Sequence, residues 1–339
     1  MIKPGIIWGK HYKQLIDKAK RHQYALPAIN ITTMDMLNNV LEAASIYKSD
    51  IIIQLSYERA QFIAGYGLNK TPLECATIGA LMVATHAHLL AKHYGICVVL
   101  HTDHANRRLI PWIEQLVNLS DYWYKQHKTP LFSSHMIDLS EEPIDQNIDT
   151  CKFWLKRFNS LGIGLEMELG ITGGEEDGIG HELNSIKNTD LLYTNPADVL
   201  KAYNELNHLG NLSIAASFGN IHGVYKVGNV RLKPTILQDS QRLICQQKNI
   251  SLSNIVNFVF HGGSGSSRQN IMEAIEYGVF KFNISTDIQF AYSQGIYQET
   301  ITNNNCSYLH FTRKKILKKM KEVFHLLGSK NQTITSHCS

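Results

Sequence analysis

Eight short runs of apolar residues recur along the chain, and segments with a helical pattern separate most of them. A parallel strand buried on both faces has this appearance. Eight such strands alternating with helices make a (β/α)8 barrel. A doubly wound open sheet is the competing fold, but it usually has fewer strands, and no G-x-G-x-x-G motif follows Asn30. We therefore predict an α/β fold of the (β/α)8 TIM-barrel type. The predicted strands are Ala25–Asn30, Asp50–Ser56, Val98–His104, Leu131–Asp138, Gly164–Gly170, Ser213–Gly219, Asn257–Gly263 and Val279–Thr286.

Helix signals fill several of the gaps between these strands. Thr33 is placed to cap a helix over Met34–Tyr47, whose apolar residues recur at steps of three and four. Asn195, Pro196 and Asp198 supply an N-cap, a proline in the first turn and an acidic residue beside the helix N-terminus. Further helices are predicted over Leu73–Tyr94, Pro234–Gln247 and Ser267–Tyr277.

Composition limits the classes of partner. The chain has 339 residues, 44% of them hydrophobic and 18% charged, which suits a large folded core. Its formal charge of +4 includes no basic arm for nucleic acid; the densest cluster, Arg313 to Lys321, fits one solvated face of a C-terminal helical segment at about 305–330. We expect one barrel domain over residues 1–339.

The cysteines and the N-terminus indicate a compartment. The six cysteines show no C-x-x-C spacing, which argues against a disulfide framework or a thiolate zinc site and suits a reducing environment. The segment Met1 to Gly5 has no apolar signal core, and no run of about 18 apolar residues is present. We expect a cytoplasmic protein without a membrane partner.

Polar residues stand where the predicted strands end. In a barrel these ends meet at one face, which carries the active site. A single polar strand end is more often only a capped or hydrogen-bonded group, but here the pattern repeats. The residues at these ends are Asn30, Ser56, Asp103, His104, Asp138, Glu168, His222, His261 and Asn283.

Three of these residues predict a metal site. His104, His222 and His261 belong to three different strands, and three imidazoles leave a fourth position open, as in catalytic zinc sites. Glu168 is a candidate for a fourth, exchangeable ligand. The alternative for each histidine is a satisfied polar group in the core. The ligand set also suits cobalt or iron.

Two glycine-rich loops add further chemistry. The turn from His261 to Ser266 can bring backbone N–H groups to a phosphate, with Asn283 and Thr286 as further donors; the alternative is a flexible turn. The loop from Gly173 to Gly178 carries carboxylates that can swing into a site as acid or base; the alternative is a solvated acidic loop. Metal, phosphate site and two separate carboxylates suit a reaction through an enediolate next to a polarised carbonyl.

Longer motifs carry a resemblance to a known family. The chain resembles the class II (zinc-dependent) fructose-bisphosphate aldolases, of the bacterial type that forms dimers, from Lys3 to about residue 300. The motifs that carry the resemblance are Leu26-Pro27-Ala28-Ile29-Asn30, His101-Thr102-Asp103-His104, Phe132-Ser133-Ser134-His135-Met136-Ile137-Asp138, Thr172-Gly173-Gly174-Glu175-Glu176-Asp177-Gly178, the segment from Ala216 to Tyr225, and His261-Gly262-Gly263-Ser264-Gly265.

The resemblance implies an activity, a set of roles and cofactors. The activity is reversible cleavage of fructose 1,6-bisphosphate to dihydroxyacetone phosphate and glyceraldehyde 3-phosphate in glycolysis and gluconeogenesis, by a homodimer. Asp103 would take the proton of the C4 hydroxyl, and Glu176 would protonate the enediolate of dihydroxyacetone phosphate. A monovalent cation, K⁺ or Na⁺, would bind backbone oxygens near Gly223 and Gly262. The remaining roles would be catalytic Zn²⁺ on His104, His222 and His261, an alternative or second metal position at Glu168 with Asp138, one phosphate on Gly223, Gly262, Ser264, Asn283 and Thr286, and a substrate channel lined by Asn30 and Ser56.

The chain departs from the family pattern in three places. Ser285 stands where the motif Asn-x-Asp-Thr-Asp has its first Asp, and Tyr57-Glu58-Arg59-Ala60 replaces Asn-Gly-Gly-Ala. The segment from Asn303 to Lys315 lacks the Arg-Ala-Gly motif whose arginine reads the distal phosphate; Arg313 and Arg59 are the candidate substitutes. These departures keep two alternatives open: a tagatose-bisphosphate aldolase, and a zinc-binding paralogue that catalyses poorly and acts in binding or regulation. A zinc hydrolase is a third alternative, which explains the metal site but not the phosphate loop from His261 to Gly265.

Overall fold

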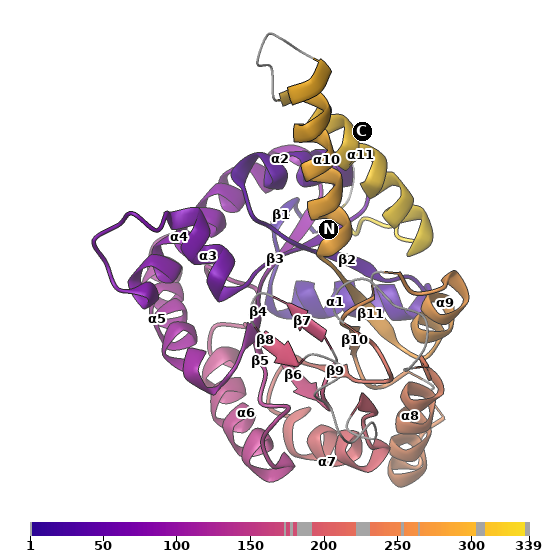
Figure 1. The fold of residues 1–339 in the computed structure, drawn as a ribbon. Coiled ribbons are helices and arrows are strands. Elements are labelled where there is room, and N and C mark those ends of the chain that lie inside the picture. The colour runs from indigo at the N-terminus through magenta and orange to yellow at the C-terminus, as the bar shows by residue number, and fades with distance from the viewer. Residues whose placement is uncertain are drawn as a thin grey trace.

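Eight parallel strands close into a barrel in the computed structural model (Figure 1). The structure describes residues 2–172, 174–176, 179–181, 192–221, 231–251, 254–263, 265–302 and 309–335, with 174–176, 179–181, 299–300, 302 and 309 described by their backbone alone. The barrel strands are β2 (Leu26–Asn30), β3 (Ile51–Leu55), β4 (Cys97–Ala105), β5 (Ser134–Ile137), β6 (Gly164–Leu169), β9 (Leu212–Ala216), β10 (Phe258–Phe260) and β11 (Val279–Ile284). They pair in chain order, and pairing of β2 with β11 closes the ring. The predicted (β/α)8 barrel is confirmed.

Helices surround the strands, as Figure 1 shows in the view along the barrel. They are α2 (Met34–Ile46), α3 (Tyr57–Ala64), α4 (Pro72–Leu90), α5 (Ile110–His127), α6 (Ile144–Asn159), α7 (Pro196–Leu206), α8 (Thr235–Lys248), α9 (Arg268–Glu276), α10 (Thr286–Thr302) and α11 (Leu309–Leu326). Their apolar sides and the outward faces of the strands form the larger core, which includes Ile53, Trp112, Phe158 and Phe260. Every residue of the eight barrel strands is buried, which explains why the strands read as continuous apolar runs.

The predicted helix caps are present. Thr33 Oγ1 accepts a hydrogen bond from Met36 N at 3.3 Å at the start of α2. Asn195 Oδ1 accepts from Ala197 N at 3.0 Å at the start of α7, where Pro196 is the first helical residue. Both side chains satisfy backbone donors that a helix start would otherwise leave without a partner.

One end of the barrel interior is closed by an apolar floor. Helix α1 (Gly9–Arg21) lies across this end, preceded by the short strand β1 (Gly5–Ile6), which pairs with β4. The members of the floor cluster are Ile7, Tyr12, Leu15, Ile16, Ala19, Tyr24, Leu26, Ala28, Ile52, Cys97, Val99, Ala215, Val259 and Phe280. The floor therefore joins α1 to strand residues that face the barrel interior.

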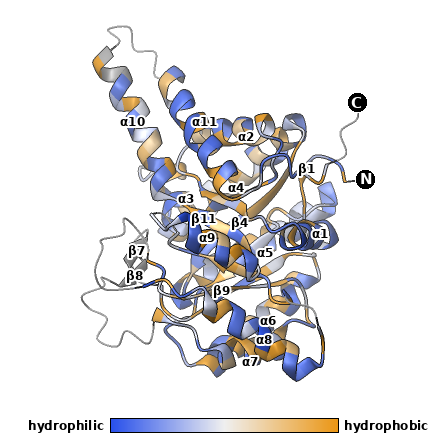
Figure 2. Ribbon diagram, turned by 90° about the vertical axis from the view of Figure 1, so that its right-hand side faces the viewer, coloured by the Kyte–Doolittle hydropathy of each residue, from blue (hydrophilic) through white to orange (hydrophobic). Residues whose placement is uncertain are grey.

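The opposite end carries the loops that follow the strands. The two-stranded antiparallel hairpin of β7 (Gly174–Glu176) and β8 (Ile179–His181) follows β6 and lies outside the barrel at this end (Figures 1 and 2). Helices α10 and α11 pack on each other, and α10 projects beyond the barrel (Figure 2).

One segment is long and apolar enough to cross a membrane by length and composition, Pro72–Tyr94, where sequence reading found no such run. In the structure it is α4 followed by the short 3-10 helix Ala91–Tyr94, and both lie in the helical layer of the barrel. Ala76, Ala80 and Ala84 on α4 are fully buried in the larger core. Its apolar composition therefore serves packing within the fold.

Candidate active site

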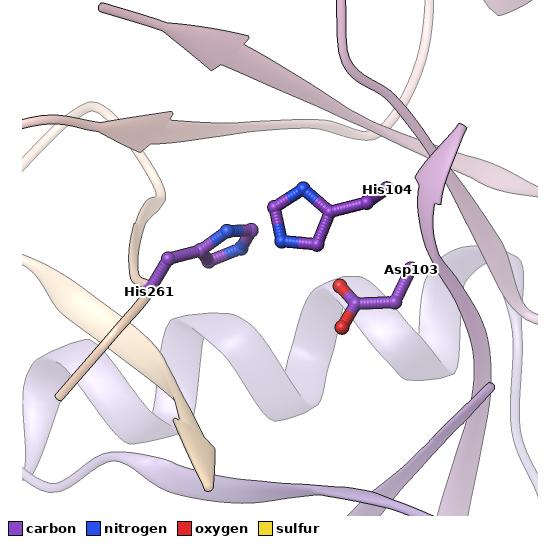
Figure 3. A group of neighbouring side chains, drawn as sticks. All are labelled: Asp103, His104 and His261. Carbon is purple, nitrogen blue, oxygen red and sulfur yellow. The ribbon is translucent and has the colours of Figure 1, made fainter. Parts of the chain in front are cut away.

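An irregularity in β4 brings two neighbouring side chains to one place. Thr102 is paired with His135 but Ala105 with Ile137, so β4 has one extra residue over this stretch. His104 has a φ of +43°, in the left-handed region that few residues other than glycine adopt. Successive side chains of a regular strand point to opposite faces. The bulge allows Asp103 and His104 to point to the same side, toward His261 (Figure 3).

Amide groups from three strands hold the Asp103 carboxylate. Asn30 Nδ2 on β2 and Gln54 Nε2 on β3 donate to Asp103 Oδ2 at 2.9 and 2.8 Å, and Asn283 Nδ2 on β11 lies 3.5 Å from Oδ1. All four side chains are buried. Donors fixed in this way favour the carboxylate form and hold it in one orientation.

His104 is paired with a second carboxylate. Its Nδ1 lies 3.0 Å from Asp138 Oδ2, and Ser140 Oγ donates to Asp138 Oδ1 at 2.7 Å. Burial would raise the pKa of Asp138, but the His104 and Ser140 hydrogen bonds outweigh it and bring that pKa to about 2. Burial would lower the pKa of His104, but Asp103 and Asp138 hold it well above its ordinary value. The imidazole therefore sits among negative charges, as a ligand of a cation does.

His261 follows β10 and contacts two glutamates of β6. Its Nε2 lies 2.9 Å from Glu166 Oε1, and its Nδ1 lies 3.2 Å from Glu168 Oε2. Burial lowers the pKa of His261, against the effect of Glu166, so the ring is neutral. The ring centroids of His104 and His261 are 4.7 Å apart, with the rings at 72° to each other (Figure 3).

The pKa values of Glu168 and Glu166 are shifted in opposite directions. Burial and the nearby Asp138 raise the pKa of Glu168 well above its usual value, and Thr172 Oγ1 donates to its Oε1 at 2.9 Å. Burial also disfavours the Glu166 carboxylate, but Lys281 and His101 hold its pKa below the usual range.

The donor groups fit a metal ion. Donor atoms of Asp103, His104 and His261 lie within 4.8 Å of one another, and so do those of His104, Asp138 and Glu168. These two candidate groups share His104, and a third consists of His101, Asp103 and Glu166. Imidazole nitrogens with carboxylate oxygens suit zinc and neighbouring divalent metals.

Most of the predicted substrate-binding residues also lie at this end of the barrel. Asn30 and Asn283 contact Asp103, as described above. Ser56 is buried and caps α3, with its Oγ 3.4 Å from Arg59 N. Gly262 has a φ of +59°, which suits glycine, and Thr286 is the first residue of α10 instead of the last of a strand.

Four of the predicted positions cannot be placed. His222, Gly223 and Ser264 lie outside the described residues. Glu176 has its backbone in β7, and its side chain also lies outside the described part. The structure therefore brings His104 and His261 together and leaves the third histidine as a prediction.

Two of the three departures from the family pattern meet at the end of β11. Arg59 is only 5% exposed, and its Nη2 donates to Ser285 Oγ at 2.7 Å. The Gln289 side-chain oxygen, in the orientation that satisfies both groups, accepts from Arg59 Nη2 at 2.6 Å and Nη1 at 2.9 Å. Arg313 instead forms a half-exposed ion pair with Glu42, with Nε donating to Oε2 at 2.7 Å. Of the two candidate arginines, only Arg59 contacts the end of β11.

Sequence reading missed three polar residues in this region, Gln54, Glu166 and Lys281. Each lies inside a strand that is otherwise almost entirely apolar, and each is at most 1% exposed. A polar residue within an otherwise apolar strand could have identified them, because a buried polar side chain needs a hydrogen-bond partner.

Comparisons with known proteins find similar sequences and a similar structure over most of the chain. The family model described as fructose-bisphosphate aldolase class-II matches residues 10–332. The chain is 50% identical over 311 residues to the fructose-bisphosphate aldolase class 2 of Buchnera aphidicola subsp. Baizongia pistaciae, which covers 91% of this chain and 85% of the relative. It is 48% identical over 297 residues to the enzyme of that name from Escherichia coli strain K12, covering 87% and 82%. The crystal structure of fructose-bisphosphate aldolase from Campylobacter jejuni superposes with a TM-score of 0.87 at 39% identity and covers 98% of both chains.

Proposed function

The chain belongs to the class II fructose-bisphosphate aldolase family, a family of lyases, and from this premise we propose how its residues carry out the cleavage of fructose 1,6-bisphosphate. The observation that carries the proposal is the convergence of Asp103, His104 and His261 within 4.8 Å at the end of the barrel where loops follow the strands. Barrel enzymes have their active sites at this end.

His104, His222 and His261 are proposed to hold the catalytic zinc, and Glu168 with Asp138 an alternative or second position. When bound, the ion polarises the substrate carbonyl and stabilises negative charge on its oxygen. The neutral state of His261 and the carboxylate of Asp138 beside His104 support these roles. Asp138 fixes the His104 ring through Nδ1, which leaves Nε2 for the metal.

Asp103 is proposed to accept the C4 hydroxyl proton when the carbon–carbon bond breaks. Its support is the set of amide donors from Asn30, Gln54 and Asn283, which hold the carboxylate ready to accept a proton. Glu176 is proposed to protonate the dihydroxyacetone phosphate carbon from the loop that follows β6. Two carboxylates from different elements, Glu176 on β7 and Asp103 on β4, suit two proton transfers on different parts of the substrate.

The two phosphates are proposed to bind to different groups of residues at the end of the barrel where loops follow the strands. Gly223, Gly262, Ser264, Asn283 and Thr286 would bind the phosphate of the dihydroxyacetone half, and Asn30 and Ser56 would line the channel. Arg59 is proposed for the distal phosphate, because a guanidinium binds phosphate through paired donors. Its contact with Ser285 at the end of β11 supports this role.

The remaining proposals concern assembly and conditions. A K⁺ or Na⁺ ion would bind near Gly223 and Gly262, and the protein would act in the cytoplasm as a single-domain barrel over residues 1–339.

A homodimer is supported by Phe290, Tyr297 and Ile301, which are exposed at spacings that share one face of α10. Sedimentation analysis would test the dimer directly.

The test is steady-state cleavage of fructose 1,6-bisphosphate by zinc-loaded protein, before and after a chelator, and again after zinc is restored. We expect turnover that the chelator abolishes and zinc restores. Because Arg59 and Ser285 alter the mouth, tagatose 1,6-bisphosphate is the comparison substrate. A higher kcat/KM for tagatose would contradict the substrate assignment, and zinc binding without turnover on either sugar would contradict the proposed catalysis.

A further inference from the structure

An ion pair lies at the centre of the barrel, between the floor and the site. Lys281 on β11 is fully buried, and its Nζ lies 2.7 Å from Glu166 Oε2 and 3.0 Å from Oε1. Glu166 on β6 is also fully buried. β6 and β11 are not neighbours in the sheet, so the pair spans the barrel interior.

Stability alone does not account for such a pair. Removing two charges from water costs several kcal/mol per ion, and well-packed apolar residues in their place are often neutral or stabilising. The floor directly below shows that this barrel can fill its interior with apolar side chains, among them Val259 and Phe280. β11 even has an irregular register, with Val259 opposite Lys281 and Phe258 opposite Val279, which places Lys281 on the inward side. The pair therefore has a purpose other than packing.

The Glu166 carboxylate is the group that connects the pair to the site. Its Oε1 lies 2.9 Å from His261 Nε2, on the side of the ring away from Glu168. A carboxylate can only accept, so His261 Nε2 must carry the proton and Nδ1 must carry the lone pair. Nδ1 is the nitrogen on the side of Glu168, within the candidate metal site.

Lys281 holds the Glu166 carboxylate in the position that faces His261 Nε2. Lys281 Nζ donates to both Glu166 oxygens, including the Oε1 that faces His261 Nε2. These bonds fix the position and orientation of the carboxylate that accepts from the ring. Glu166 also affects how strongly His261 binds a metal. A carboxylate that accepts a hydrogen bond from Nε2–H makes Nδ1 a stronger electron-pair donor to the metal.

We propose that Glu166 and Lys281 form a positioning pair that fixes the tautomer and orientation of His261 and thereby sets the affinity of the site for its metal. This inference rests on the proposed metal site, but it concerns zinc affinity and needs no turnover. Glu166 contacts His261 and Lys281 contacts Glu166, so both residues are proposed to act through His261.

The test is the double variant E166Q/K281M in the full-length protein. It replaces the ion pair by a neutral pair of similar size, so no uncompensated charge is left in the core. A glutamine can present either its oxygen or its nitrogen to Nε2 and fixes no tautomer. The matched control is K152M/E205Q, which makes the same change at a surface ion pair 2.7 Å long that contacts no candidate ligand.

Zinc affinity is measured by competition with a fluorescent chelator on metal-free protein, with thermal unfolding as the check on folding. We expect the Kd for zinc to rise by about 10–100-fold in E166Q/K281M and to be unchanged in the control. An unchanged Kd in a folded E166Q/K281M protein would overturn the proposal. Normal zinc binding without cleavage by the unaltered protein would count against the proposed function alone.

A second measurement covers the case in which the double variant does not fold. The imidazole ¹⁵N shifts of metal-free, unaltered protein report the tautomer of His261, whose signals are assigned by their loss in His261→Asn. We expect the Nε2–H tautomer at neutral pH. An Nδ1–H tautomer would overturn the proposal.

Discussion

The two ends of the barrel interior are built on the same strands but from opposite chemistry. At the floor, the inward positions are Ala28, Ile52, Val99 and Val259, and they pack against α1. The residues two positions later in the chain are polar: Asn30, Gln54, His101 and, just after β10, His261. Residues two positions apart on a strand point to the same face, so the apolar layer of the floor is followed directly by a polar layer.

The difference separates stability from chemistry. The floor is stabilised by burial of apolar surface, which has no preferred direction. The polar end consists of groups held by specific partners, such as Asp103 among amides and Glu166 beside Lys281. Substitutions at the floor should therefore change the free energy of unfolding, and substitutions at the polar end should change catalysis or metal affinity.

The largest expected effect is that of Asp103→Ala on turnover. Removing a positioned general base lowers kcat by about 10²- to 10⁴-fold. The measurement is the kcat for cleavage of fructose 1,6-bisphosphate, with the melting temperature as the folding control. If kcat were unchanged in the folded variant, Asp103 would not be the base.

Leu15→Ala tests whether the apolar floor contributes to stability without contributing to catalysis. Leu15 on α1 is fully buried in the floor, and truncation of such a side chain costs about 2–5 kcal/mol of unfolding free energy. We expect urea unfolding to show this loss while kcat at 25 °C stays within about twofold, a margin that corresponds to less than 0.5 kcal/mol. A fall in kcat as large as that of Asp103→Ala would show that the two ends are not independent.

Acid unfolding of metal-free protein tests the His104–Asp138 pair. The pKa of Asp138 is about 2 in the folded protein and about 3.9 in an unfolded chain, so its carboxylate stabilises the fold above the higher value. This contribution, on the order of 2–3 kcal/mol, is lost as the pH falls from about 5 toward 2. Asp138→Asn should remove that part of the pH dependence in urea titrations. If the variant and the unaltered protein lost stability in parallel, the pair would not be coupled as the contacts indicate.

The smallest effect is expected for Arg59→Ala. Loss of a charge-assisted contact to the distal phosphate is worth about 1.5–3 kcal/mol, or roughly a 10- to 100-fold rise in KM. The matched control is Arg313→Ala, since Arg313 pairs with Glu42 away from β11 and should leave KM unchanged. Equal KM values for both variants and the unaltered protein would remove Arg59 from the substrate site.

The sequence predicted the strands well because burial on both faces leaves a strong local signal. All eight predicted runs overlap a barrel strand, six of them contain the whole strand, and the predicted caps Thr33 and Asn195 bond as expected. Strand ends were less accurate, since His261 follows β10 and Thr286 starts α10. At those two positions the chain already turns into the following loop or helix.

Part of the site could be predicted because some of its residues come at or just after the ends of buried apolar strands. Asp103, His104 and His261 stand at strand ends, where a polar residue is conspicuous. Gln54, Glu166 and Lys281 were missed because their partners lie on other strands, and the pairing of side chains across a barrel depends on register. The bulges at Thr102–Ala105 and near Lys281 also have no reliable local signature.

The most direct test of the polar end as a metal site is a crystal structure of zinc-loaded protein with anomalous data collected on both sides of the zinc edge. We predict one strong anomalous peak within bonding distance, about 2.0–2.2 Å, of a His104 nitrogen and of His261 Nδ1. A peak at neither histidine in fully loaded protein would contradict the assignment of this end of the barrel as the catalytic site.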